Sequence, residues 1–269
     1  MTRVLITGAA GNLGGMLRRG LKHRGFGVRS TDISPASDLE PDDEFVQVDL
    51  RDGVAVAAAM EAVDAVVHFG AIPVEDTFGA IIEANIRGTY NVFEAARQAG
   101  ARRVVFASTN HVVGFHRRSS TIDDMAVRRP DSHYGVSKAF GEDLGRLYAD
   151  KHGMGVMCVR IGSCLPRPGD ARHLNTWISE RDLVQLVAVG LEAPRLHFQV
   201  VYGISGNTRA WWDNSAAYDL GYRPDDDSEV YADEILARDC PEKVDDIALQ
   251  FQGGVFTSAD FDGDPDNID

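Results

Sequence analysis

Tyr134 and Lys138, in the stretch Tyr134-Gly135-Val136-Ser137-Lys138, are the residues best placed to do chemistry. Side chains four apart on a helix share a face, so the phenol and the ammonium would lie together. A phenol with an ordinary pKa of about 10 is a weak base at neutral pH. A nearby ammonium favours the phenolate, which could accept an alcohol's proton as hydride leaves its carbon. The alternative is an ordinary amphipathic Tyr-Lys pair.

A second set of polar residues, Ser108-Thr109-Asn110-His111, follows an apolar run. Thr109 precedes Tyr134 by 25 residues and could bond the reacting oxygen and orient it. Asn110 and His111 are candidate substrate contacts. His111 is equally compatible with a loop histidine that has its own partners.

A glycine-rich turn lies about 120 residues before Tyr134. Gly8, Gly11 and Gly14 directly follow an apolar run and open a predicted helix. Side chains there would hold the backbone away from a pyrophosphate, or the helix away from the sheet. The amides of the first helical turn, with Asn12 and Leu13, would face the phosphates. The pattern predicts a dinucleotide site, and a plain left-handed turn is the alternative.

Acidic residues end two further predicted strands. Asp32, 18 residues after Gly14, could accept hydrogen bonds from both adenosine ribose hydroxyls and would repel a 2′-phosphate. It therefore favours NAD over NADP, although Arg29 is close enough to weaken that preference. The alternative for Asp32 is a helix cap or a surface acid. Asp49-Leu50 fits an adenine contact.

These residues can act together only if the fold brings them to the same edge of a β-sheet. Strands are predicted at 3–7, 28–31, 45–48, 64–69, 103–107 and 155–161, and helices at 12–24, 77–99 and 132–152. Such alternation requires parallel pairing and right-handed crossovers. We expect an α/β fold, a doubly wound parallel sheet of Rossmann type. Its ligand crevice lies at the carboxyl ends of the strands, where Gly70, Ala71 and Ile161 also fall.

Three regions are expected along the chain. Residues 1–162 form the NAD-binding region with the Tyr-Lys pair. The regular alternation stops after about Ser163, where Pro166, Pro168 and Gly169 interrupt it. Residues 163–259, with a helix at 181–192 and a strand at 199–203, are expected to form a small substrate-side cap packed on the sheet. Residues 260–269 contain five Asp and are expected to be a mobile acidic tail.

The bulk composition excludes several classes of partner. Forty-one acidic and 27 basic residues give a net charge of −14, which repels nucleic acid and anionic membranes. No run approaches the roughly 18 apolar residues of a membrane span. Three scattered cysteines, Cys158, Cys164 and Cys240, form neither a disulfide framework nor a metal cluster. We expect reduced thiols, a cytoplasmic location and no metal.

The acidic excess is made of 29 Asp against 12 Glu, with only four Lys. An ordinary acidic surface is one explanation. Adaptation to high salt, where self-repulsion is screened over a few Å, is the one that the scarcity of lysine favours.

These motifs together resemble the extended short-chain dehydrogenase/reductase family, over nearly the whole chain. The characteristic motifs of this family are Gly-x-x-Gly-x-x-Gly, a Ser or Thr after the fifth strand, and Tyr-x-x-x-Lys. Within it the chain resembles the uronate dehydrogenases, which implies NAD-dependent oxidation of C1 of galacturonate or glucuronate to an aldarolactone. The resembling stretches are 106–111, 128–135, 160–164, 170–172, 176–179, 211–214 and 252–256.

The resemblance also implies roles for single residues. Arg172 would clamp the sugar carboxylate through its planar fork, the alternative being an ordinary surface arginine. Ser163, Asn110 and His111 would bind ring hydroxyls. Phe256 would pack on the sugar. The set is completed by Asn85, which would support Lys138, and by Pro73, which borders the substrate where the relatives usually have serine.

Other functions stay open on the same scaffold. Related enzymes oxidise neutral pentoses such as L-arabinose, or glucose 6-phosphate, with NAD or NADP. A nucleotide-sugar epimerase or dehydratase is a further alternative, and a non-catalytic NAD sensor is another. A homo-oligomer is expected, with the helices beginning at Thr77 and Ser132 as a candidate seam.

Overall fold

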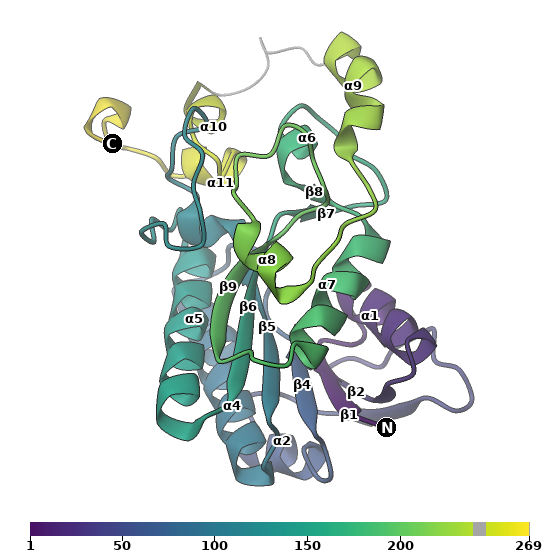
Figure 1. Ribbon diagram of the computed structural model, residues 1–269. Helices are drawn as coiled ribbons and strands as arrows, with labels where there is room; N and C mark the ends of the chain where they lie inside the picture. Colours follow the sequence, from purple (N-terminus) through teal and green to yellow (C-terminus); the bar gives the residue numbers. More distant parts are fainter. Residues whose placement is uncertain (239–245, 269) are drawn as a thin grey trace.

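Seven parallel strands form the centre of the fold, in the order β3-β2-β1-β4-β5-β6-β9 (Figure 1). The computed structural model describes residues 1–238 and 246–268, so Cys240, Lys243 and Asp269 lie outside the described residues. The strands are β1 (Arg3–Thr7), β2 (Gly27–Asp32), β3 (Glu44–Gln47), β4 (Ala65–His68), β5 (Arg103–Thr109), β6 (Gly155–Ile161) and β9 (Phe198–Gly203).

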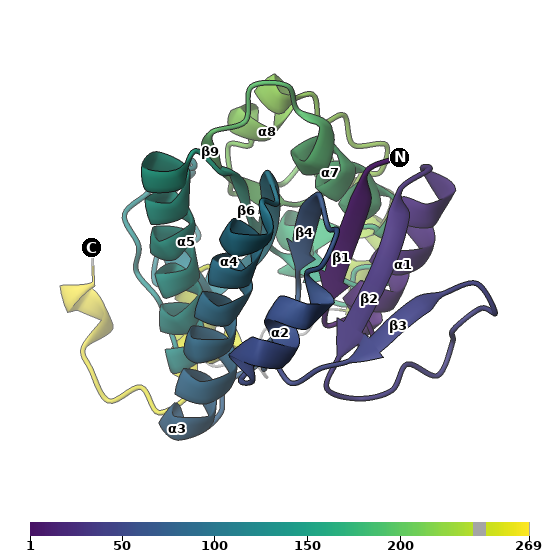
Figure 2. The same ribbon diagram turned by 90° about the horizontal axis from the view of Figure 1, so that it is seen from below.

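Helices cover both faces of this sheet because its strands are apolar on both sides. Val4 and Ile6 of β1 pack in one cluster and Leu5 in the other. The first face carries α1 (Asn12–His23) and α7 (Glu180–Glu192), and the second carries α2 (Gly53–Ala59), α4 (Gly88–Ala99) and α5 (His133–His152) (Figure 2). The predicted doubly wound α/β fold is confirmed.

The strand order reverses between β1 and β4. The chain runs outward from β1 to β3 on one side, and from β4 to β9 on the other. Loops that leave β1 and β4 therefore diverge and leave a crevice at the carboxyl ends of the strands, which is where such sheets bind ligands.

Two helices differ from the predictions. The helix predicted at 77–99 is continuous but not uniform: α3 (Phe78–Ile81) and α4 flank a π-helical turn, η1 (Ile82–Arg87). The extra residue in each hydrogen-bonded turn does not change the mainly apolar pattern, so the sequence does not reveal it. The sequence prediction also omits α2, whose alanine-rich segment begins at Asp52, an N-cap that accepts from two backbone amides.

The boundary expected at residue 163 does not divide the fold. Helix α7 packs on α1, and β9 pairs along its length with β6 as the last strand of the main sheet. These two elements continue the alternation, whereas the Pro-rich stretch before them is an insertion. The expected cap would then consist only of residues on either side of the α7–β9 unit.

The remaining elements lie mostly beyond the carboxyl ends of the strands (Figure 1). They are η2 (Asn110–Val113), β7 (Ser163–Cys164), α6 (His173–Thr176), β8 (Trp177–Ile178), α8 (Ser215–Leu220), η3 (Ser228–Tyr231), α9 (Ala232–Arg238), α10 (Asp246–Gln250), α11 (Val255–Ser258) and η5 (Pro265–Asn267).

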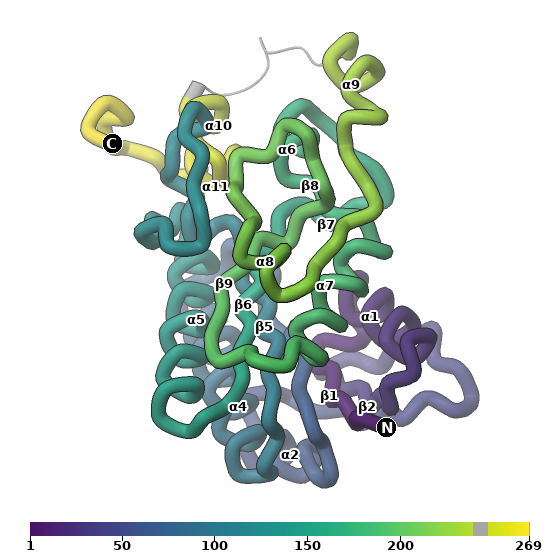
Figure 3. The backbone as a smooth tube through the Cα atoms, viewed as in Figure 1, coloured from purple at the N-terminus to yellow at the C-terminus, as the bar shows by residue number. Residues whose placement is uncertain are grey.

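The C-terminal segment is attached to the loop that precedes α5. Arg117 and Phe251 form an antiparallel bridge, and Figure 3 shows this loop beside α10 and α11. Arg117 Nη2 also donates to the carbonyls of Pro265 and Ile268, at 2.6 and 2.8 Å. The predicted mobility of the tail stays a prediction, but its described part has these contacts.

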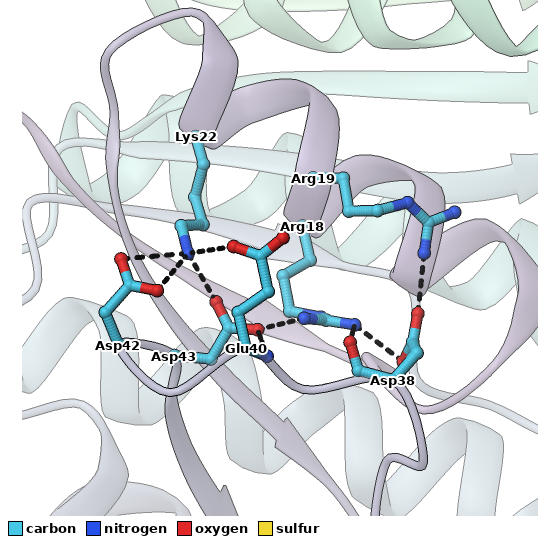
Figure 4. Close-up of polar contacts among 7 residues, drawn as sticks. All are labelled: Arg18, Arg19, Lys22, Asp38, Glu40, Asp42 and Asp43. Carbon is cyan, nitrogen blue, oxygen red and sulfur yellow. Dashed lines mark hydrogen bonds and ion pairs between the residues drawn. The ribbon is translucent and has the colours of Figure 1, made fainter.

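The loop between β2 and β3 is tied to α1 by ion pairs (Figure 4). Arg18, 1% exposed, pairs with Asp43 and, at 2.6 Å, with Asp38. Lys22 Nζ lies 2.7 Å from the second Asp43 oxygen. Burial raises the pKa of Asp43, but the bond from Lys22 and the charge of Arg18 outweigh it, so the pKa is lowered.

No helix in the described part of the chain is long and apolar enough to span a membrane. Cys158 is a buried free thiol in β6, and Cys164 is a free, partly buried thiol.

Candidate active site

A pocket of about 930 Å³ occupies the crevice at the carboxyl ends of the strands. It extends from the glycine turn after β1, past the ends of β2 and β4, to the start of α5. Most of the predicted site residues line it: Gly8, Gly11, Asn12, Leu13, Gly14, Asp32, Asp49, Leu50, Gly70, Ala71, Pro73, Thr109, Asn110, His111, Tyr134, Lys138 and Ile161. A volume of this size suits a large cofactor together with a small substrate.

The glycine turn brings the backbone of β1 close to that of β4. Gly8 has a positive φ of 74°, and a Cβ on it would lie 2.7 Å from the Gly70 nitrogen. A Cβ on Gly14 would lie 2.0 Å from the Gly8 carbonyl oxygen. Gly11 begins α1 without a side-chain cap, so the first-turn amides are left for a ligand. This geometry suits a pyrophosphate.

Asp32 lines the pocket and also fixes the turns around it. Its carboxylate accepts from the backbone amides of Ala10 and Ser34, both at 3.0 Å. The predicted ribose acceptor is therefore held on the glycine turn itself.

Asp49 has a partner that the sequence prediction missed. Arg51 also lines the pocket, and its guanidinium donates to both Asp49 oxygens. Hydrogen bonds from Arg51 lower the pKa of Asp49. An ion pair thus borders the position predicted for adenine.

Asn85 lies behind the pocket in the π-helical turn η1. Its side chain accepts from the Ile72 amide at 2.8 Å and donates to the Ile72 carbonyl and the Ser137 hydroxyl. The predicted support for Lys138 is therefore not a direct bond. Asn85 instead connects the pocket loop at Ile72 to the helix that carries Lys138.

Tyr134 and Lys138 face the pocket from α5 and are both nearly buried, at 8% and 4% exposure. Burial raises the pKa of Tyr134 to about 12, with a smaller contribution from Asp131, while a hydrogen bond with Thr109 acts in the opposite direction. Burial lowers the pKa of Lys138 to about 7. The sequence predicts that the ammonium favours the phenolate, but in the protein alone burial has the larger effect.

The start of α5 is fixed by two acceptors. Ser132, which the sequence predicts to lie inside the helix, is its N-cap and accepts from Gly135. Glu75, from the loop after β4, accepts from the amides of His133 and Tyr134 at 3.2 and 2.8 Å. The sequence prediction missed Glu75 because nothing local relates it to a helix that begins 58 residues later.

His111 has its own partners. Its Nδ1 lies 2.8 Å from Asp131, whose side chain is fully buried, and its ring stacks on Phe256 with centroids 3.9 Å apart. The ring is edge-on to Tyr134 at 6.1 Å. The interpretation as a histidine with its own partners is confirmed, and because His111 also lines the pocket, its role as a substrate contact stays a prediction.

Arg172 lies one layer behind Asn110. With the Asn110 amide oriented so that both ends are bonded, its oxygen accepts from Arg172 Nη2 at 2.8 Å and its nitrogen donates to the Ile161 carbonyl. Arg172 Nε donates to the Gln252 carbonyl at 2.9 Å. No carboxylate among the described residues forms an ion pair with Arg172. Burial lowers its pKa to about 10, aided by Arg118, while the charges of Asp170 and Asp131 act in the opposite direction, so it stays charged at neutral pH.

Three predicted substrate residues differ in position. Ser163 Oγ lies 3.0 Å from the Thr176 hydroxyl, beside Cys164, which lines the pocket. Phe256 reaches the pocket only through His111. Pro73 lines it directly and supplies no donor. Of the predicted site residues, Ser163, Arg172, Phe256 and Asn85 are thus not among those that line the pocket.

Comparisons with known proteins agree with this geometry. Residues 4–193 match the model of the NAD dependent epimerase/dehydratase family. The chain is 45% identical to a uronate dehydrogenase of Pseudomonas putida over 258 residues, 96% of each chain. It is similar to the structure of a glucuronic acid dehydrogenase from Chromohalobacter salexigens (TM-score 0.92, 43% identity, 99% of each chain). It is also similar to a mutant uronate dehydrogenase of Agrobacterium tumefaciens complexed with NAD (TM-score 0.91, 43% identity, 96% of this chain and 97% of that one).

Proposed function

The chain belongs to the NAD dependent epimerase/dehydratase family, and from this premise we propose that it oxidises a hexuronate at C1. The substrate is D-galacturonate or D-glucuronate, the oxidant is NAD and the product is an aldarolactone. Relatives of that activity, similar over nearly the whole chain, support the proposal.

The observation that carries it is the state of Arg172. A partly buried, charged guanidinium is held by two neutral oxygens, those of Gln252 and Asn110, and forms no ion pair with a carboxylate among the described residues. Burying a cation is costly unless an anion compensates for it. A substrate carboxylate at the Asn110 side of the pocket would supply that anion, whereas a neutral sugar would not.

The cofactor side fits NAD. The glycine turn and the start of α1 would hold the pyrophosphate, and Asp32 would accept from the adenosine ribose. Because this carboxylate would repel a 2′-phosphate, we expect a preference for NAD over NADP. When bound, NAD accepts the hydride from C1 and its oxidised ring adds a positive charge beside the site.

Side chains of the protein remove the proton of the substrate's C1 hydroxyl. Tyr134 takes the proton of the C1 hydroxyl as the C1–H bonding pair leaves, and C1 becomes a carbonyl. Thr109 bonds the phenol, which counteracts the effect of burial on the Tyr134 pKa, and Thr109 would also orient the reacting oxygen. Lys138, whose pKa of about 7 leaves it partly charged at neutral pH, would bind the nicotinamide ribose and favour the phenolate.

The test uses matched substrates. L-Arabinose has the ring of D-galacturonate without the carboxylate, and D-xylose has that of D-glucuronate. We expect NADH formation at 340 nm with the two uronates and far less with the pentoses, glucose 6-phosphate or NADP. Turnover of the pentoses alone would overturn the uronate assignment, and cofactor retained through purification without net turnover would indicate an epimerase.

We further propose that the protein works in the cytoplasm of a salt-accumulating cell. The scarcity of lysine, the excess of Asp and the free thiols Cys158 and Cys164 support this. The melting temperature should rise by several degrees between dilute and molar KCl. An unchanged or lower melting temperature would contradict the salt adaptation.

A homo-oligomer is the remaining proposal. Helices α4 and α5 pack side by side and expose apolar side chains, among them Tyr90, Val136 and Leu147, each about half exposed. Light scattering behind a sizing column would give the mass in solution, and a monomer of 29.3 kDa would contradict the proposal.

A further inference from the structure

Gln252 is the most completely buried amide near the substrate side of the pocket. It has no exposed surface. Its Oε1 accepts from Trp212 Nε1 at 2.7 Å, and its Nε2 donates to the carbonyls of Arg117 and Ser120 at 3.1 and 2.9 Å. Both ends of the amide are satisfied, which fixes the side chain and the backbone that carries it.

That backbone forms one wall around Arg172. The Gln252 carbonyl accepts from Arg172 Nε at 2.9 Å. Two residues on, Gly254 has a φ of 66°, and a Cβ there would lie 2.9 Å from Arg172 Cδ and Nε. Because Gly254 has no Cβ, the turn leaves room for the Arg172 side chain to lie against it.

The two protein acceptors leave part of the guanidinium for a ligand. A guanidinium has five N–H donors, of which Gln252 takes Nε–H and Asn110 takes one at Nη2. Nη1 has no hydrogen bond to the described residues. Since both acceptors are neutral, they orient the fork without neutralising it, and the remaining edge can meet a carboxylate with two parallel bonds.

The turn is itself anchored by segments far away in sequence. The Gln252 amide donates to the His116 carbonyl, and the Gly253 amide to that of Gly114. Trp212, which bonds the Gln252 side chain, stacks on Tyr202 of β9 with centroids 4.8 Å apart. The part of the C-terminal segment that contacts Arg172 is thus held in place by the loop before α5 and by the indole of Trp212.

We propose that Gln252 is a positioning residue for Arg172: its buried amide fixes the turn whose carbonyl aims the guanidinium at the substrate, and so sets the preference for anionic over neutral sugars. This inference rests on the proposed function. It does not require Gln252 to touch substrate or cofactor.

The test replaces the amide and compares matched sugars. Gln252→Met keeps the length of the side chain and removes its three hydrogen bonds. We expect KM for D-galacturonate to rise at least tenfold, with kcat within about threefold and KM for NAD unchanged. The preference in kcat/KM for D-galacturonate over L-arabinose should fall by the same factor as KM rises.

Two further variants make the test specific. Trp212→Phe removes only the indole N–H and keeps the ring on Tyr202, so it should change KM in the same direction by about threefold; it carries the test if Gln252→Met does not fold. Gln199→Met removes a partly buried amide of β9 that bonds Asp124, away from Arg172, and should change neither KM nor preference.

The outcomes separate this inference from the proposed function. A wild-type enzyme active on uronates, with unchanged KM and preference in both test variants, would overturn the role of Gln252 alone. An equal loss of kcat on both sugars would also overturn it, because that indicates general structural damage. A wild-type enzyme inactive on uronates would overturn both proposals.

Discussion

The two halves of the pocket are built in different ways. The cofactor half consists mainly of backbone: a turn from Gly8 to Gly14, the start of α1 and the ends of parallel strands. The substrate half consists of side chains from segments far apart, such as Asn110, Arg172 and Phe256, which meet behind the pocket wall.

The halves also differ in whether their cationic side chains form ion pairs with carboxylates. Arg18, on the cofactor side, is buried and paired with Asp43 and Asp38, which ties a loop to a helix. Lys138 is buried and Arg172 is partly buried, and neither forms an ion pair with a carboxylate in the described part of the chain. A paired charge contributes to structure, whereas an unpaired one is available to a ligand at some cost in stability. Single substitutions should therefore damage the substrate half more.

Replacing Tyr134 with phenylalanine should have the largest effect. The variant lacks the group that takes the proton, and general-base contributions are about 10²- to 10⁴-fold. We expect kcat to fall by at least about 100-fold, with the KM for NAD nearly unchanged because the cofactor half is intact. The rate of NADH formation at 340 nm would measure kcat, and quenching of the protein's fluorescence would measure NAD binding. Near-normal turnover would rule out Tyr134 as the base.

Arg172→Met should come next and should affect one class of substrate. Removing one partner of a buried charge pair costs about 2–5 kcal/mol. Taking the lower part of that range, we expect kcat/KM for D-galacturonate to fall by roughly 30- to 150-fold, at 1.36 kcal/mol per decade. L-Arabinose, without the carboxylate, serves as the control and should lose little. Equal losses on both sugars would mean that Arg172 supports the fold instead of the substrate.

Asp32→Ala tests the cofactor half and should have a smaller effect. The variant loses the acceptor for the adenosine ribose and its repulsion of a 2′-phosphate. We expect the NAD-over-NADP preference in kcat/KM to fall by about tenfold, which corresponds to one good hydrogen bond to a charged group. A preference that did not change would show that the backbone turn alone selects the cofactor.

The same contrast explains what the sequence could predict. The glycine turn, Asp32 and the Tyr134–Lys138 pair are local patterns, because each depends on neighbouring residues or on one helical repeat. The strands were recognisable from apolar runs for the same reason. Once their order along the chain was known, the rules for parallel sheets placed their ends together.

The parts that the sequence did not predict depend on contacts between distant segments. Nothing near Glu75 indicates that it caps α5, and nothing near β9 indicates that it pairs with β6. Arg172 was recognised only through a family resemblance. Its orientation by Gln252 is a property of four chain segments folded together, and no local periodicity carries that information.

Lys138 offers the last and smallest test, through stability. Its pKa falls from 10.5 in the unfolded chain to about 7 in the folded protein because of burial. Between these values the unfolded chain binds more protons, so stability rises with pH. The cost of burying the ammonium is therefore fully present below about pH 7 and is relieved as pH rises from the folded pKa towards the unfolded value of 10.5.

The variant Lys138→Met should remove this dependence. Relative to the wild type it should gain about 1 kcal/mol more in unfolding free energy at pH 6 than at pH 8, since a shift of one pKa unit corresponds to 1.36 kcal/mol. Urea unfolding of both proteins at the two pH values measures the difference. Because both proteins are measured at the same two pH values, the contributions of the other titrating groups cancel in the comparison. If the difference in unfolding free energy between the two proteins were the same at both pH values, Lys138 would not be desolvated as its buried position beside Tyr134 implies. The contrast between paired and unpaired cations would then fail at the catalytic lysine.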